Sequence, residues 1–124
     1  MESKKILIVD DNAKNRKLLR VILRQAGYII FEAEDGREGV DAAQRIGPHL
    51  ILMDYRMPEY DGIQATQILK ADAATSHIPV FIVTSSAMKG DLERIMAESG
   101  CDQLFNKPID YRAILDAVQK QLGG

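Results

Sequence analysis

Residues 5–12, KILIVDDN, place four consecutive aliphatic side chains, Ile6 to Val9, directly before two carboxylates, Asp10 and Asp11. An apolar run without polar alternation is typical of a strand that is buried on both faces, as in a parallel sheet. Ionised groups are costly to bury in such an interior unless they are paired. The stretch therefore predicts a buried strand that carries its two acids at its carboxyl end.

The same rhythm of short apolar runs continues along the chain. Further strands are expected at 50–53 (LILM) and 80–83 (VFIV), with weaker candidates at 28–33 (YIIFEA) and 103–105 (QLF). Helical spacing is expected over 13–25, from Asp35 to Gly47, over 62–71, over 88–98 and from Asp110 to Leu122. Asp35 is expected to cap its helix, with Glu38 in the reciprocal position. Alternating strands and helices predict an α/β fold with a parallel sheet covered on both faces.

Length and composition limit the class of protein. The 124 residues are expected to form one domain, and a net charge of −2 gives no general attraction for nucleic acid or an anionic membrane. The apolar runs are too short to span a bilayer, and we see no signal peptide. Cys101 is the only cysteine, so no internal disulfide can form. We therefore expect a cytoplasmic protein.

Polar residues follow four of the expected strands. They are Asp10 and Asp11 after the first, Asp54 after the third, Thr84 and Ser85 after the fourth, and Lys107 and Pro108 after the fifth. Open α/β sheets bind ligands at the carboxyl ends of their strands, where the strand order reverses. If the order is 2-1-3-4-5, these residues share one crevice.

Three carboxylates in one crevice require a counter-charge that a single lysine does not supply. Two unit charges about 4 Å apart repel by roughly 4 kcal/mol at an effective dielectric near 20. An all-oxygen site without nearby His or Cys favours Mg²⁺, with Mn²⁺ as a substitute. With such a cation, the ammonium and the hydroxyl would bind phosphate oxygens, and a carboxylate would serve as nucleophile to give an aspartyl phosphate.

Four segments in this order resemble the signature of the receiver domains of two-component response regulators. They are LIVDDN (7–12), LILMDYRMPEYDG (50–62), VTSSA (83–87) and KP (107–108). The resemblance implies a flavodoxin-like, doubly wound (βα)5 three-layer sandwich over residues 1–124, with no output domain visible. The stretch AMKGD (87–91) and the short length are similar to stand-alone receivers of bacterial cell-cycle control. The chain fits equally a whole protein and the receiver part of a longer regulator or hybrid kinase.

The resemblance implies a role for each acid. Asp54 would accept the phosphoryl group from a histidine kinase or a histidine phosphotransfer protein. Asp11 and Asp54 would bind Mg²⁺ directly, together with the backbone carbonyl of Arg56. Asp10 would hold the metal through water.

The resemblance also implies how the signal leaves the site. Thr84 and Lys107 would each bind a phosphate oxygen, and the Lys107–Pro108 peptide bond is expected to be cis. Phosphorylation would draw Thr84 and the loop after it inward and repack the surface of helix 4, strand 5 and helix 5. The partners would be the kinase and a downstream protein, without direct nucleic-acid or membrane binding, and the chain would be a monomer or a phosphorylation-dependent dimer.

Two features depart from the pattern of the family. Most receivers carry Tyr or Phe at the position of Leu104, and here the aromatic residue is Phe105, which strand alternation directs to the opposite face. Either Leu104 slides inward in its place, or the signal relies on loop and helix-4 movement alone. The resemblance also implies that Arg56 and Ser86 occupy positions that influence the rate of dephosphorylation in this family. We expect Arg56 to contact the phosphoryl group or occlude the attacking water.

Two other functions remain as alternatives. The first is a scaffold with the same fold that is never phosphorylated, as in degenerate receivers. The second is a small-molecule enzyme, either an FMN protein or an aspartate-nucleophile phosphatase. An FMN protein needs a Gly- and hydroxyl-rich phosphate loop, which DNAKN (11–15) lacks. An aspartate-nucleophile phosphatase needs Asp-x-Asp where this chain has adjacent acids.

Overall fold

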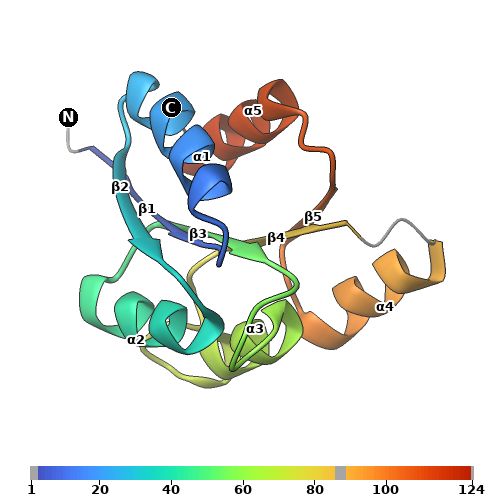
Figure 1. Cartoon of the computed structure of the whole chain (residues 1–124). Coiled ribbons are helices and arrows are strands. Elements are labelled where there is room, and N and C mark those ends of the chain that lie inside the picture. The colour runs from blue at the N-terminus through green and yellow to red at the C-terminus, as the bar shows by residue number, and fades with distance from the viewer. Residues whose placement is uncertain (1–2, 86–88, 124) are drawn as a thin grey trace.

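The computed structural model describes residues 3–85 and 89–123, in which strands and helices alternate (Figure 1). The strands are β1 (Lys5–Val9), β2 (Ile29–Ala33), β3 (Leu50–Asp54), β4 (Val80–Thr84) and β5 (Gln103–Asn106). The helices are α1 (Ala13–Gln25), α2 (Gly36–Ile46), α3 (Gly62–Ala71), α4 (Lys89–Ser99) and α5 (Tyr111–Leu122). In this part of the chain, no helix has the length and apolar character needed to cross a membrane.

All neighbouring strands are parallel, in the order β2-β1-β3-β4-β5, as expected. The register aligns Val9 with Met53. The next residues along the two strands, Asp10 and Asp54, therefore lie side by side at the carboxyl end of the sheet. Chain reversal after each strand requires a helical crossover, and the strand order reverses between β1 and β3. The carboxyl ends of β1, β3, β4 and β5 consequently form one edge.

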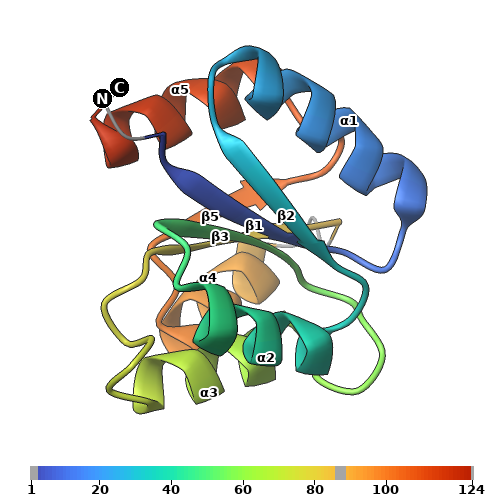
Figure 2. The same cartoon turned by 90° about the vertical axis from the view of Figure 1, so that its left-hand side faces the viewer.

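The helices cover both faces of the sheet, with α1 and α5 on one side and α2, α3 and α4 on the other (Figure 2). Successive residues of β1 enter opposite cores: Leu7 and Val9 pack on the side of α2 and α3, and Ile6 and Ile8 on the side of α1 and α5. Both faces being buried explains why the strand lacks polar alternation. The expected fold is confirmed.

Helix ends differ from the expectation in small ways. The carboxylate of Asp35 accepts the Glu38 backbone N–H at 2.8 Å, which is one half of the expected reciprocal cap. The complete reciprocal pair lies instead at Asp61 and Gln64, where the two bonds measure 2.8 and 3.0 Å. Tyr28 was expected in β2, but its N–H is donated to the carbonyl of Leu23, so it closes α1.

The loop after β3 folds tightly back on the end of that strand. The N–H of Gly62 is donated to the Tyr55 carbonyl at 2.7 Å, and a Cβ on Gly62 would lie 2.8 Å from the Asp54 carbonyl oxygen. Only glycine permits this approach without a shift of the backbone. The start of α3 is therefore held directly beside the Asp54 backbone.

Candidate functional site

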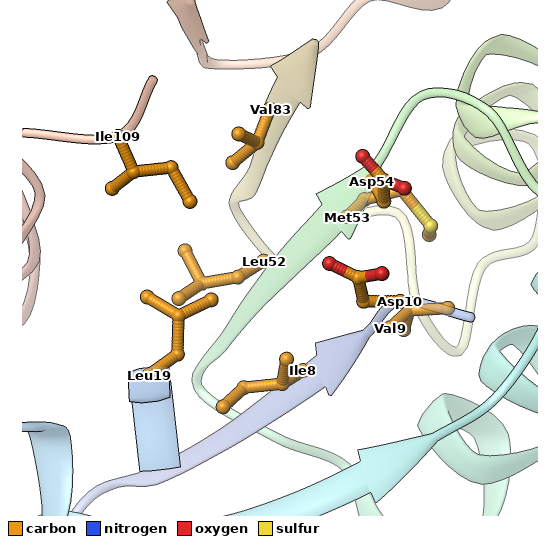
Figure 3. A pocket seen from close by; sticks show the side chains of 9 residues that line it. All are labelled: Ile8, Val9, Asp10, Leu19, Leu52, Met53, Asp54, Val83 and Ile109. Carbon is orange, nitrogen blue, oxygen red and sulfur yellow. The ribbon is translucent and has the colours of Figure 1, made fainter. Parts of the chain in front are cut away.

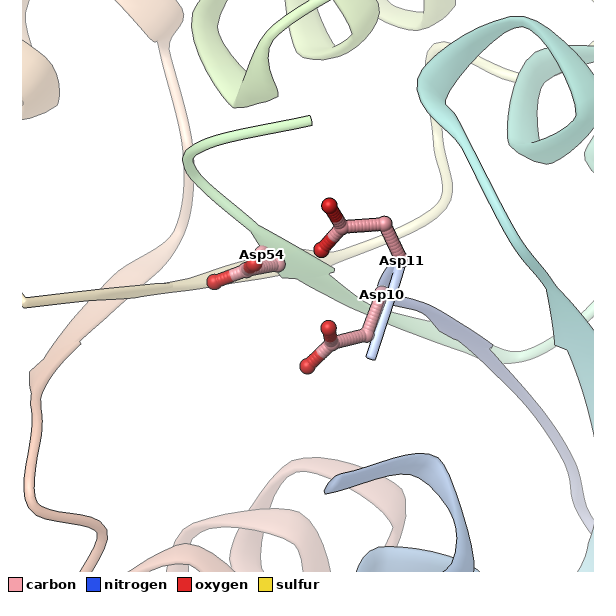
Figure 4. Close-up of side chains that lie close together, drawn as sticks. All are labelled: Asp10, Asp11 and Asp54. Atoms are coloured by element: carbon pink, nitrogen blue, oxygen red, sulfur yellow. The ribbon is translucent and has the colours of Figure 1, made fainter. Parts of the chain in front are cut away.

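Three carboxylates meet at the carboxyl edge of the sheet. One oxygen from each of Asp10, Asp11 and Asp54 lies within 4.8 Å of the others. Figure 4 shows Asp10 and Asp11 reaching from the end of β1 and Asp54 from the end of β3. Asp10 and Asp54 are buried, whereas Asp11 is exposed. The edge therefore has an inner pair of acids and an outer acid open to solvent.

Local hydrogen bonds hold the loop that carries Asp10 and Asp11. The Asp10 N–H extends the ladder of the sheet to the Ala33 carbonyl at 3.1 Å. Its carboxylate accepts the Asn12 N–H at 2.9 Å, and the Asn12 side chain in turn accepts the Asn15 N–H at 3.0 Å and caps α1. Strand and helix thus meet through a short, hydrogen-bonded turn that leaves little freedom to the two acids.

Lys107 supplies a positive charge at this edge. Its Nζ lies 3.0 Å from Asp54 Oδ1, and its backbone N–H is donated to the Thr84 carbonyl at 2.7 Å. The Lys107–Pro108 peptide bond is cis, as expected. The loop after β5 is in this way tied both to the end of β4 and to the acid at the end of β3.

Burial raises the pKa of both inner acids above the ordinary value of 3.8. For Asp54, burial is the largest cause and the neighbouring Asp10 charge adds to it, while Lys107 opposes the rise. For Asp10, burial again dominates, and the Asn12 N–H and the Lys107 charge oppose it. Burial and mutual repulsion disfavour the ionised forms of these two acids, and a bound cation would stabilise those forms.

The apolar surroundings of these acids explain the burial. A cavity of about 10 Å³ lies beside Asp10 and Asp54, no larger than the volume that one water needs. Apart from the two acids, its wall is formed by Ile8, Val9, Leu19, Leu52, Met53, Val83 and Ile109 (Figure 3). Because these side chains offer no hydrogen bonds, the carboxylates are solvated mainly from the outer side of the edge.

The donor set fits a hard divalent cation. The three acids offer oxygen ligands only, and one ammonium does not balance three negative charges. A metal such as Mg²⁺ would replace the water that burial has removed and would neutralise the remaining charge. The contribution of the Arg56 backbone carbonyl as a further ligand stays a prediction.

The remaining expected site residues lie around this cluster. Thr84 is buried at the end of β4, and Ser85 after it is exposed. The Arg56 side chain is exposed, and its guanidinium carbon lies 6.0 Å from the centre of the Tyr55 ring. Ser86 and Met88, where the fourth helix was expected to begin, fall outside the described residues.

Leu104 and Phe105 point to opposite faces of the sheet, as strand alternation predicted. Leu104 packs against the core on the side of α2, α3 and α4. Phe105 packs on the other side, with its ring centre 5.8 Å from that of Phe81. The face toward α2, α3 and α4 therefore carries an aliphatic side chain at this level, and the aromatic ring lies on the opposite face.

Several residues beside the acids were not predicted. The Asn15 side chain hydrogen-bonds to Asp10 and lowers its pKa, and Arg16 donates to the Asp10 carbonyl at 2.7 Å. Tyr55 Oη accepts a hydrogen bond of 3.2 Å from Arg94 of α4. For Asn15 the spacing of four residues from Asp11 was an available signal, because the first turn of a helix faces the strand end that precedes it. Nothing in the sequence pairs Tyr55 with Arg94.

Comparison with known proteins identifies the relatives of this chain. Residues 6–119 match the family model described as "Response regulator receiver domain". The polar-differentiation response regulator DivK of Brucella ovis is 40% identical over 121 residues, which are 98% of this chain and 98% of that protein. DivK of Brucella anthropi is 41% identical over 120 residues, 97% of each chain.

Solved structures with the same fold include receivers attached to sensor kinases. The receiver domain of the sensor histidine kinase PA1611 of Pseudomonas aeruginosa has a TM-score of 0.89 at 30% identity, over 99% of this chain and 100% of that one. That crystal structure has a magnesium ion coordinated in the active site cleft. The signal receiver domain of a histidine kinase from Syntrophus aciditrophicus has a TM-score of 0.91 at 31% identity, over 98% of this chain and 92% of that one.

Proposed function

Because this chain belongs to the response regulator receiver domain family of two-component signalling, we propose that Asp54 is its phosphoacceptor and that Mg²⁺ is its metal. The observation that carries the proposal is the environment of the Asp54 carboxylate. It is buried, lies 3.0 Å from the Lys107 ammonium, and has two further acids within 4.8 Å. Such a group is a nucleophile surrounded by the charges that a phosphoryl group needs.

In the proposed reaction, an Asp54 carboxylate oxygen attacks the phosphorus of a phosphohistidine. The new O–P bond forms as the P–N bond breaks, and the leaving imidazole nitrogen takes the electron pair. Asp11 and Asp54, with the Arg56 carbonyl, would hold Mg²⁺, and Asp10 would hold it through water. The metal supplies charge neutralisation for the phosphoryl oxygens.

Two residues of this chain would receive the transferred group. The Lys107 ammonium would move from Asp54 to one phosphoryl oxygen, because it already lies 3.0 Å from the attacking carboxylate. The Thr84 hydroxyl, at the end of the neighbouring strand, would donate to another. The same residues, with the metal, would later assist the water that hydrolyses the acyl phosphate, so the chain would catalyse only its own phosphorylation and dephosphorylation.

The output would come from the surface of α4, β5 and α5. A shallow, open groove between α4 and β5 lies on this surface, lined by Leu92, Glu93, Met96, Ala97 and Leu104. In the pairing of β4 with β5, Leu104 lies opposite Ile82, two residues before Asn106, which lies opposite Thr84. Movement of Thr84 toward the phosphoryl group would reach the groove either through Leu104 or through the loop that follows Thr84 and α4.

We further propose that the chain acts in the cytoplasm. A histidine kinase or phosphotransfer protein would be the donor, and a downstream protein the receiver of the signal. The similarity to the DivK proteins, which are response regulators, supports this role in signalling. We propose a monomer or a phosphorylation-dependent dimer, and light scattering with and without a phosphodonor measures which of the two forms.

Mass spectrometry after incubation with acetyl phosphate and Mg²⁺ tests the proposal. We expect one phosphoryl group on Asp54 and none in Asp54→Asn. Asp116→Asn is a matched control, because Asp116 is an exposed acid on α5 that pairs with Lys120. Absence of phosphate on wild-type Asp54 would contradict the proposal and favour the scaffold. If Asp54 is phosphorylated, profiling against the histidine kinases of the organism identifies the donor.

A further inference from the structure

Arg16 lies directly behind the two acids at the end of β1. Its side chain is only 12% exposed, although arginine is usually among the most exposed residues. Its guanidinium donates to the Asp10 carbonyl at 2.7 Å and pairs with Glu32 at 3.3 Å and with Glu34 at 3.5 Å. The Arg16 side chain, in the first turn of α1, thus contacts the end of β1 through Asp10 and the end of β2 through Glu32 and Glu34.

The Asp10 carbonyl belongs to the peptide that joins Asp10 to Asp11. On the other side of Asp10, its N–H is held by the Ala33 carbonyl at 3.1 Å. Arg16 therefore secures the second end of a short segment whose first end is held by the sheet. Rotation of this peptide would swing the Asp11 carboxylate, which is exposed and reaches the cluster from the outer side.

The charge of Arg16 is balanced away from the cluster. Glu32 and Glu34 both pair with it, and Glu32 is also bound by Arg20 at 2.5 Å. The charges that shift the pKa of Asp10 are those of Lys107 and Asp11. The contribution of Arg16 to the site is therefore one of geometry more than of electrostatic field.

We propose that Arg16 is a positioning residue of the metal centre: held by Glu32 and Glu34, it fixes the Asp10 carbonyl and thereby the orientation of the Asp10 and Asp11 carboxylates. This inference rests on the proposed function of these acids as metal ligands. A planar fork of donors is needed, because one group must reach a carbonyl and two carboxylates at once. Lysine carries the charge but not the fork.

Titration with Mn²⁺, followed by the paramagnetic resonance signal of the free ion, measures the affinity without any phosphorylation. Partners that orient metal ligands contribute about 10- to 100-fold to affinity, so we expect Arg16→Gln to weaken binding about tenfold. Arg16→Lys, which keeps the charge, should weaken it as well. Arg20→Gln is the matched control, because it removes an ion pair with the same Glu32 but no contact with the Asp10 carbonyl.

A second measurement separates positioning from loss of stability. With acetyl phosphate as donor, the Mg²⁺ concentration for half-maximal rate should rise in the Arg16 variants, while the rate at saturating Mg²⁺ should return close to that of the wild type. Urea unfolding of the metal-free variants confirms that they are folded. Arg16→Lys keeps the test available if Arg16→Gln does not fold.

The outcomes are distinct. Weaker Mn²⁺ binding in the Arg16 variants with unchanged binding in Arg20→Gln supports the inference. Wild-type affinity in both Arg16 variants would overturn it, and so would equal weakening in Arg20→Gln, which would assign the effect to the ion-pair network as a whole. Wild-type protein that binds no Mn²⁺ would overturn the proposed metal centre, and the inference with it.

Discussion

Lys107 Nζ lies 3.0 Å from Asp54 Oδ1, so the loop after β5 brings a positive charge to the acid at the end of β3. Burial and the neighbouring Asp10 charge raise the pKa of Asp54, whereas Lys107 lowers it. The ionised, nucleophilic form of Asp54 therefore depends on a residue from a distant part of the chain. Removing that residue has consequences that can be measured.

Lys107→Met keeps much of the length of the side chain and removes the ammonium. Loss of one donor to a developing charge lowers reaction rates by about 100-fold or more, so phosphorylation by acetyl phosphate at saturating Mg²⁺ should fall by that order. Lys120→Met is the control, because Lys120 is exposed on α5 and pairs with Asp116. Equal rates in the wild type and Lys107→Met would remove Lys107 from the proposed mechanism.

The two inner acids should make the metal-free protein lose stability as the pH rises above 3.8, the ordinary pKa of an aspartate. The pKa values of Asp10 and Asp54 are raised above 3.8 by folding, so the folded state binds protons that the unfolded chain releases. Their contribution is fully present below the unfolded pKa and is lost as the pH rises through the folded pKa. Urea unfolding in the presence of a chelator measures this slope.

Asp54→Asn isolates the contribution of one acid to that slope. The variant should be more stable than the wild type at neutral pH in chelator and should show a flatter dependence on pH. Added Mg²⁺ should stabilise the wild type at neutral pH and have less effect on the variant. Identical pH slopes in the two proteins would show that the inner acids do not determine the stability of the metal-free state.

Arg56→Asn should shorten the lifetime of the phosphorylated protein. In the unphosphorylated structure the Arg56 side chain is exposed beside the Tyr55 ring, so it is available to cover a phosphoryl group on Asp54. A contact of roughly 1 kcal/mol would change the rate of hydrolysis about fivefold. Loss of phosphate is timed after removal of the donor, with Arg45→Asn on α2 as control. An unchanged lifetime would leave Arg56 without this role.

Thr66→Val should stabilise the protein. Thr66 Oγ1 is buried in α3 and has no hydrogen-bond partner among the described residues. Removing a buried unsatisfied hydroxyl recovers its desolvation penalty, so we expect a gain of about 1 kcal/mol in the free energy of unfolding. Thr75→Val should do the reverse, because Thr75 Oγ1 donates to the Leu69 carbonyl at 2.7 Å. Equal effects of the two substitutions would contradict this.

Gly36→Ala should destabilise the protein, whereas Gly90→Ala should not. A Cβ on Gly36 would lie 2.2 Å from the Tyr60 carbonyl oxygen, in the loop that follows Asp54, and no atom of the described residues lies within 4 Å of a Cβ on Gly90. Forced contacts of this kind cost about 1–3 kcal/mol. At Gly90, in α4, alanine should add up to about 1 kcal/mol. Urea unfolding of both variants measures the difference.

Most of the fold could be predicted because the strands are buried on both faces. Runs such as Leu50–Met53 and Val80–Val83 have no polar residue, which is typical of strands in a parallel sheet that is covered on both faces. Ends of elements were less certain, since local hydrogen bonds decide them. Asp61 and Gln64 had the spacing of a reciprocal cap, yet the cap was assigned to Asp35 and Glu38, where the same spacing occurs.

The acids and Lys107 could also be predicted, because their places at strand ends follow from the order of the elements. The sequence by itself placed Asp10, Asp11, Asp54 and Lys107 at the carboxyl ends of strands, and the strand order then brought them to one edge. It could not select Glu32 and Glu34 as partners of Arg16 among the eighteen acidic residues of the chain. Only tertiary structure decided this, because an ion pair between α1 and β2 depends on the strand order and register that place β2 beside β1.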